Sequence, residues 1–97
     1  MEGGAMNGYA GDKKNIQMRM HRIEGQVKAI GRMVDDDRYC IDILTQIAAV
    51  ESALKSVSML LLDDHLDHCV REAVEQGGQV ADAKLQEVSE AVSRLVK

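Results

Sequence analysis

The chain has 97 residues, a formal net charge of −4 at pH 7 and 45% apolar residues, with no Pro, Phe or Trp. This length allows one small domain, and the apolar content excludes a globally disordered chain. The net charge excludes a uniformly basic nucleic-acid binder. Ala, Leu, Met, Glu, Gln and Lys are abundant, so we expect an all-α fold.

The N-terminal residues 1–11 are rich in glycine and show no apolar periodicity, so we expect a disordered tail before a single domain at 12–97. They also lack the apolar core of a signal peptide. The longest aliphatic run, residues 59–62, is too short to span a membrane. We therefore expect a cytoplasmic protein without a membrane partner, where both cysteines stay reduced.

The first predicted helix begins after Asp12, a plausible N-cap, and ends near Val34. Its charge differs from that of the rest of the chain. Residues 1–34 hold six Lys and Arg against three Asp and Glu, whereas residues 35–97 hold six against thirteen. The cations fall mainly on the face opposite the apolar one: Lys13, Lys14, Arg19, Arg22, Lys28 and Arg32. This face is either simply solvated or binds phosphates, so the pattern allows DNA binding without demonstrating it.

The second predicted helix begins near Arg38, with the acids Asp35–Asp37 at its start, and ends near Gln76 before Gly77 and Gly78. Its apolar residues recur at spacings of four and three along one seam: Ile43, Ile47, Val50, Leu54, Val57 and Leu61. A third, short amphipathic helix follows the glycines. We expect three helices per chain, forming an antiparallel hairpin that pairs with a second copy as a four-helix-bundle dimer.

Three residues with metal-binding side chains lie at the two ends of the second helix. Cys40, His65 and Cys69 project within roughly 60° of the apolar seam, and His65 and Cys69 are four residues apart on one face. A straight helix holds Cys40 about 37 Å from His65, at ~1.5 Å per residue. Two antiparallel copies would bring Cys40 of one beside His65 and Cys69 of the other.

Two thiolates and one imidazole suit Cu(I), a soft ion that accepts three ligands. Structural Zn²⁺ prefers four ligands, and His68 or Asp64 would have to supply the fourth. A cysteine on an apolar seam can also be a small buried hydrophobe. The alignment of Cys40 with a His and a second Cys favours a metal site over that alternative.

The residues that frame this spacing resemble those of the copper-sensing operon repressors, the CsoR/RcnR family. The resemblance covers nearly everything from Lys13 onward and is carried by these residues: Arg22-Ile23-Glu24-Gly25-Gln26-Val27, Arg32-Met33, Tyr39-Cys40-Ile41-Asp42-Ile43-Leu44, Gln46, Leu61-Leu62, His65 and Cys69-Val70. It implies an all-helical dimer that assembles into a homotetramer. It also implies a repressor that binds operator DNA when metal-free and releases it when Cu(I) binds across the dimer interface.

Carried over by position, the resemblance assigns the metal ligands to Cys40, His65 and Cys69. Relatives that sense nickel or cobalt replace the second Cys and add an N-terminal His, which this chain lacks before His21. The family links a Tyr and a Glu to the His ligand; Tyr39 matches the Tyr, and Glu87 is the candidate for the Glu. The implied DNA contacts are diffuse cations on the first two helices: Arg19, Arg22, Lys28, Arg32 and Lys55.

Two other classes remain as alternatives. A thiol-redox or persulfide sensor would use Cys40 and Cys69, although persulfide sensors of the family lack the His found here at position 65. A metallochaperone would bind copper but not duplex DNA. We expect no enzyme, because no nucleophile–base set and no phosphate-binding loop is present.

Overall fold

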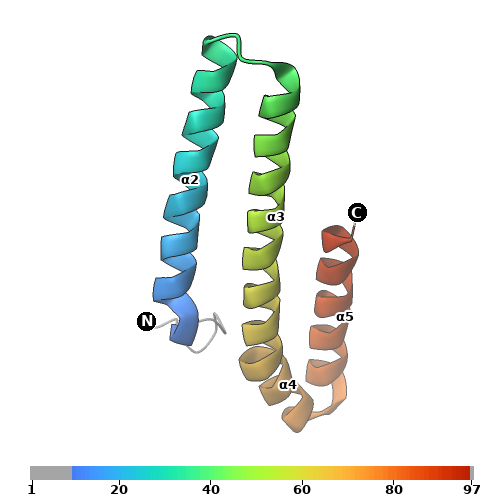
Figure 1. The fold of residues 1–97 in the computed structure, drawn as a ribbon. Helices are drawn as coiled ribbons and strands as arrows, with labels where there is room; N and C mark the ends of the chain where they lie inside the picture. Colours follow the sequence, from blue (N-terminus) through green and yellow to red (C-terminus); the bar gives the residue numbers. More distant parts are fainter. Residues whose placement is uncertain (1–9, 97) are drawn as a thin grey trace. The chain divides into compact units, whose positions relative to one another are not determined.

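Helices account for nearly all of residues 10–96, the part of the chain that the computed structural model describes (Figure 1). This part contains no strand, so the all-α prediction is confirmed. In chain order the elements are η1 (Ala10–Asp12), α2 (Lys13–Asp35), α3 (Cys40–His65), η2 (Leu66–Val70), α4 (Arg71–Gln76) and α5 (Gly78–Leu95).

The first helix has the predicted extent, with α2 beginning directly after Asp12 and ending at Asp35. Ala10 and Gly11, the last two residues of the predicted tail, belong to the 3-10 turn η1, and the disorder of the tail stays a prediction. The remainder of that tail, residues 1–9, lies outside the described residues.

The acidic run Asp35–Asp37 closes α2 instead of opening the next helix, which corrects the sequence prediction. Asp37 takes a positive φ of 54°. The backbone N–H of Asp37 donates to Val34 at 3.1 Å, and that of Arg38 donates to Met33 at 2.9 Å. These two hydrogen bonds form a Schellman motif, in which Asp tolerates the left-handed position better than most residues. The second helix therefore begins at Cys40, two residues later than expected.

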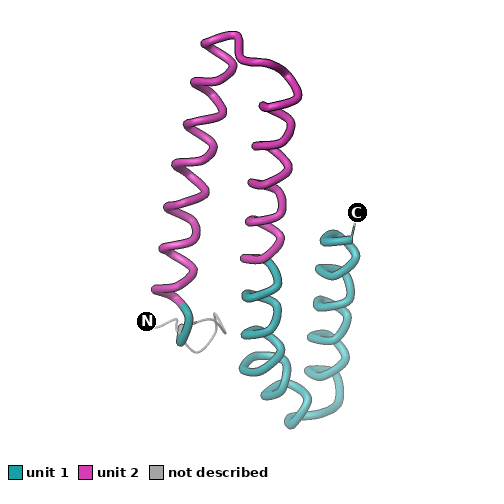
Figure 2. The backbone as a smooth tube through the Cα atoms, in the orientation of Figure 1, with its two compact units in different colours: residues 1–12, 58–97 teal, residues 13–57 magenta. Residues whose placement is uncertain are grey.

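Residues 13–57 form one compact unit, a hairpin of α2 and the first part of α3 (Figure 2). Its buried aliphatic side chains are Ile16 and Ile23 on α2 and Val50 and Val57 on α3. Each pair is seven residues apart, as the heptad pattern predicts. The other seam residues of this part are more open: Ile47 is 38% exposed and Leu54 is 42% exposed.

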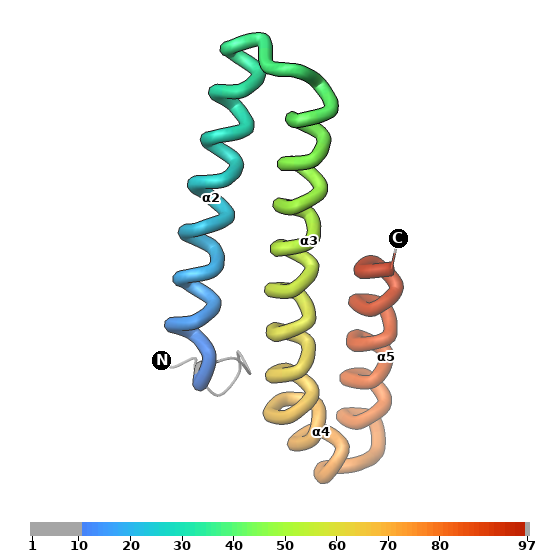
Figure 3. The backbone as a smooth tube through the Cα atoms, in the orientation of Figure 1, coloured from blue at the N-terminus to red at the C-terminus, as the bar shows by residue number. Residues whose placement is uncertain are grey.

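The second compact unit holds residues 58–96 together with η1 (Figure 2). Here the chain continues from α3 through η2 and α4, turns at the two glycines, and returns as α5 (Figure 3). Gly77 and Gly78 have φ values of 72° and 58°, a region that favours glycine. Val70, Ala73 and Ala81 are the buried apolar residues of this unit.

The helical run Cys40–Gln76 is long and apolar enough, by length and composition alone, to cross a membrane, with a mean hydropathy of 1.2 over its best window. A helix covered by another copy of the chain needs the same apolar character. Asp42, Glu51 and Lys55 lie within the run, and charged side chains inside a bilayer are costly. Its composition thus fits a protein–protein seam.

Candidate metal centre

The three candidate ligands occupy the two ends of α3. Cys40 is the first residue of α3 and has an exposed thiol, and His65 is the last residue of the same helix. Cys69 follows in η2 and is half-buried. No group of three or more His, Cys, Asp and Glu side chains within residues 10–96 could hold a metal ion. One chain thus brings His65 and Cys69 onto adjoining turns and leaves Cys40 at the start of the helix, so the three-ligand site stays a prediction that requires a second copy.

Cys69 lies in a π turn, which the sequence analysis did not predict. Residues Leu66–Val70 form this wider turn, and the N–H of Arg71 donates to the carbonyl of Leu66, five residues earlier. The segment contains neither Gly nor Pro, and nothing in its composition marks the break. Single π turns inside α-helices occur frequently at functional sites, and this one directly follows His65.

The imidazole of His65 faces a carboxylate of α5. Its Nε2 lies 3.4 Å from Oε1 of Glu87, and Nζ of Lys84 lies 3.3 Å from the same oxygen. The hydrogen bond and charge of Lys84, followed by those of His65, hold the pKa of Glu87 below its ordinary value. An ionised carboxylate therefore lies on the Nε2 side of the ring, so Nδ1 is the candidate nitrogen for a metal.

Glu87 was a candidate only through the family resemblance, and sequence reasoning did not single out Lys84. The i, i+3 spacing of Lys84 and Glu87 on the third helix was the signal that could have found it. Tyr39, the other candidate partner of the His ligand, precedes Cys40 in the other compact unit and is 66% exposed. Its assignment stays a prediction.

A second carboxylate adjoins His65 along the chain. The Oδ2 atom of Asp64 is buried and has no hydrogen-bond partner among the described residues. Desolvation raises the pKa of Asp64, and the neighbouring carboxyl group of Asp12 raises it further. Asp12 occupies the predicted position directly before α2, but its carboxyl group contacts Asp64, a pairing that no sequence pattern indicated.

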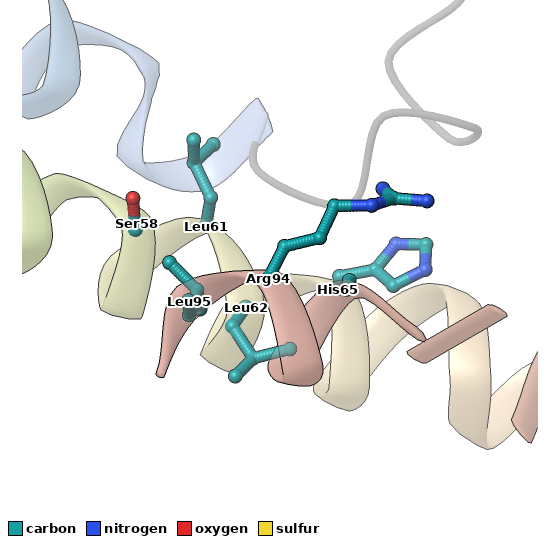
Figure 4. A pocket seen from close by; sticks show the side chains of 7 residues that line it. Ser58, Leu61, Leu62, His65, Arg94 and Leu95 are labelled. Atoms are coloured by element: carbon teal, nitrogen blue, oxygen red, sulfur yellow. The ribbon is translucent and has the colours of Figure 1, made fainter. Parts of the chain in front are cut away.

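His65 also lies at one end of an open hollow of about 450 Å³ between the last part of α3 and the end of α5 (Figure 4). The guanidinium of Arg94 lies at the same end as the imidazole (Figure 4). The remaining lining is mostly aliphatic: Ser58, Leu61, Leu62, Ala91 and Leu95. This hollow places α5 directly beside the candidate ligand.

The five candidate DNA contacts all lie in the unit of residues 13–57, four on α2 and one on α3. Arg22, Lys28, Arg32 and Lys55 are exposed. Arg19 is half-buried, and its Nε donates to Oδ1 of Asn15 at 3.2 Å. The four exposed cations are available to phosphates, and their role in DNA binding stays a prediction.

Comparison with known proteins gives one consistent result. The family described as metal-sensitive transcriptional repressor matches residues 12–94. The copper-sensing transcriptional repressor RicR of Mycobacterium tuberculosis is 56% identical over 93 residues, which cover 96% of this chain and 97% of that protein.

Two solved structures share the fold. The copper-sensing repressor CsoR with Cu(I) from Geobacillus thermodenitrificans NG80-2 superposes with a TM-score of 0.82 at 42% identity, covering 90% of this chain and 88% of that chain. The nickel-responsive transcriptional regulator InrS superposes with a TM-score of 0.71 at 36% identity, covering 84% and 90%. The same fold therefore carries responses to different metals.

Proposed function

This chain belongs to the metal-sensitive transcriptional repressor family, and from that premise we propose that it is a Cu(I)-responsive repressor of operator DNA. One observation carries the proposal: Nε2 of His65 faces the carboxylate of Glu87 at 3.4 Å, on the turn before Cys69. A carboxylate on the far nitrogen is the usual support of a metal-bound imidazole.

The donor set decides which metal this site takes. Cys40 of one copy, with His65 and Cys69 of another, would supply two thiolates and one imidazole. Soft thiolates favour Cu(I), whereas a closed Zn²⁺ site needs a fourth ligand. The 56% identity to a copper-sensing repressor and the likeness to a Cu(I)-bound structure support the same ion.

The shared site requires an antiparallel pairing of two copies, and the exposed seam residues supply a surface for it. Ile47 and Leu54 are aliphatic and open in the single chain. A second copy would cover them and complete a four-helix bundle, and two such dimers would form the homotetramer. In this assembly residues 12–97 act as one metal-sensing and DNA-binding domain.

Metal binding and DNA binding are then negatively coupled. The metal-free tetramer would hold the operator phosphates through Arg19, Arg22, Lys28, Arg32 and Lys55. Cu(I) binding would lower that affinity and derepress copper-resistance genes. Coupling energies between two sites are typically about 1–3 kcal/mol, and the effect is reciprocal at equilibrium.

The test is the affinity for operator DNA selected from random duplexes by the metal-free protein. Under reducing conditions we expect Cu(I) to raise the dissociation constant about 5–150-fold, the range of ordinary allosteric coupling. Zn²⁺ should act weakly, and Cys40→Ser should abolish the Cu(I) effect while leaving metal-free binding intact. An operator affinity that Cu(I) leaves unchanged in the wild-type protein rules the proposal out.

A further inference from the structure

Lys84 lies beside the carboxylate that faces His65, and neither the candidate metal ligands nor the candidate DNA contacts include it. Its Nζ is 3.3 Å from Oε1 of Glu87, the same oxygen that lies 3.4 Å from Nε2 of His65. The side chain of Lys84 is 31% exposed, against 59% for Glu87. The side chain of Lys84 is therefore more restricted by its neighbours than that of Glu87, so Lys84 can limit the conformations of Glu87.

The position of the two residues on α5 allows this role. Residues three apart lie on the same face of a helix, one turn from each other. Both line a hollow of about 440 Å³ along α5, together with Gln79, Val80 and Ala83. A largely exposed Glu side chain has several free rotamers, and a hydrogen bond to the ammonium of Lys84 restricts them. One carboxylate oxygen can accept from two donors, so Lys84 and His65 can share Oε1.

We propose that Lys84 is a positioning residue, which holds Oε1 of Glu87 against the Nε2–H of His65 and so fixes the tautomer that leaves Nδ1 for the metal. In a neutral ring either nitrogen can carry the proton, and the hydrogen bond that one of them makes selects the tautomer. That Nδ1 is a metal ligand rests on the proposed function. The contact that orients the ring does not depend on copper, and it is tested without it.

The first test measures the tautomer of His65 in the metal-free protein by ¹⁵N NMR of labelled imidazoles, assigned with His21→Gln and His68→Gln variants. We expect the wild type to hold Nε2 protonated and Lys84→Met to shift His65 toward a mixture of tautomers. Gln86→Met is the matched control, because Nε2 of Gln86 donates to Oε1 of Glu90 at 3.3 Å on the same helix, away from His65. It should leave the His65 signals unchanged.

The second test measures Cu(I) affinity by competition with a chelator. Loss of a partner that supports a metal ligand commonly weakens binding about 10–100-fold, and for a residue one contact further away we expect roughly 3–10-fold. Lys84→Arg keeps a cation near Glu87 and should restore most of the affinity. Far-ultraviolet circular dichroism of each variant shows that the helices are retained.

The outcomes separate this inference from the proposed function. If Lys84→Met retains both the wild-type tautomer and the wild-type Cu(I) affinity, the positioning role is wrong, whatever the protein does with DNA. If the tautomer shifts with Lys84→Met although Cu(I) does not release DNA from the wild type, Lys84 still orients His65 and only the repressor function fails.

Discussion

His65 faces Glu87 of α5 and directly follows Asp64, whose pKa is raised by Asp12 of η1, so residues from three helical segments meet around one side chain. Metal binding at one nitrogen of this imidazole would change the hydrogen bond that its other nitrogen makes with the carboxylate of Glu87. A thiol-redox sensor that uses Cys40 and Cys69 does not require the contact between His65 and Glu87. His65 is therefore the residue that separates the two classes of sensor.

We expect His65→Ala to abolish the release of DNA by Cu(I), because the metal would lose its proposed nitrogen ligand and that ligand's contact with Glu87. Release by a thiol oxidant such as diamide should change little in the same variant if the cysteines respond on their own. Operator binding by fluorescence anisotropy measures both responses. His68→Ala, at the exposed neighbouring histidine in the π turn, is the matched control and should keep the Cu(I) response. A His65→Ala protein that still responds to Cu(I) would contradict the assigned ligand.

Asp64 gives a pH-dependent prediction. Its pKa is raised in the folded protein, mainly by desolvation and then by Asp12, so the folded state binds this proton more tightly than the unfolded chain does. The resulting stability is present at acidic pH and is lost as the pH rises through the folded pKa. Asp64→Asn cannot ionise and can donate to the carboxylate of Asp12. We expect it to raise the thermal midpoint at pH 7.

The gain from Asp64→Asn should shrink as the pH falls through the raised pKa of Asp64, because the wild-type carboxyl group then becomes neutral as well. Thermal unfolding followed by circular dichroism between pH 4 and pH 8 measures this difference. Asp63→Asn, at the exposed carboxylate one residue earlier, should show no such trend. A destabilised Asp64→Asn protein at pH 7 would show that the charged form is favoured in the fold.

At this scale the sequence predicted what depends on spacing and missed what depends on side-chain conformation. Cys40, His65 and Cys69 share a helix face by arithmetic alone. Glu87 became a candidate through the family's pattern. The contact of Lys84 with Glu87 depends on side-chain rotamers. The pairing of Asp12 with Asp64 depends on how η1 packs near the end of α3. No local sequence pattern predicts either.

The turn between α4 and α5 tolerates few residue types other than glycine, because its backbone takes positive φ values. Gly77 has φ 72° and ψ −173°, and Gly78 has φ 58°. The first of these conformations is essentially restricted to glycine, because a Cβ atom would collide with the backbone. The pair was predicted to end the long helix, and α4 does end at Gln76.

We expect Gly77→Ala to cost about 1–3 kcal/mol of stability, the usual strain of a side chain in a sparsely populated region. Gly31→Ala is the contrasting variant, since Gly31 lies inside α2 with open space around its Cα. It should stabilise the protein by up to about 1 kcal/mol, as Ala does relative to Gly in a helix. Urea unfolding measures both, and equal effects of the two substitutions would contradict the role of the turn.

The ends of the helices show why boundaries were harder to predict than the helices themselves. Apolar periodicity predicted α2, the long second helix and α5, because burial of one face determines them. Asp35–Asp37 could have capped either helix, and the positive φ of Asp37 resolves the choice in favour of closing α2. The π turn at Leu66–Val70 has no such signal, since every residue in it is compatible with an ordinary α-helix.

A single copy of the chain buries only a small apolar core and leaves many large apolar side chains exposed. No large side chain among residues 10–96 is fully buried, and the buried apolar residues are only Ile, Val and Ala. Meanwhile Ile41, Leu44, Ile47 and Leu54 stay between 38% and 57% exposed on α3. A small chain with such a surface gains stability by association, so its unfolding should depend on protein concentration.

We expect Ile47→Glu to raise the dissociation constant of the oligomer more than tenfold. Each buried aliphatic side chain contributes about 1.5–3 kcal/mol, and an unpaired charge in its place adds a further penalty. Analytical ultracentrifugation at micromolar concentration measures the change. Val96→Glu is the control, because Val96 is 79% exposed at the end of the chain. If Ile47→Glu assembles like the wild type, the seam is not the interface.

The π turn has a consequence for insertions and deletions. Its hydrogen bond spans five residues instead of four, so the turn accommodates one residue more than an α-helical turn does. Deleting Leu66 or Asp67 would let the run from Cys40 to Gln76 close as a regular α-helix. The spacing of His65 and Cys69 would become three, while the helix after the turn would stay nearly in register, because the π turn holds the one extra residue that is removed. A chain shortened by one residue here would therefore keep its fold and change the spacing of the two candidate ligands, so the number of residues between them is as informative as their identity.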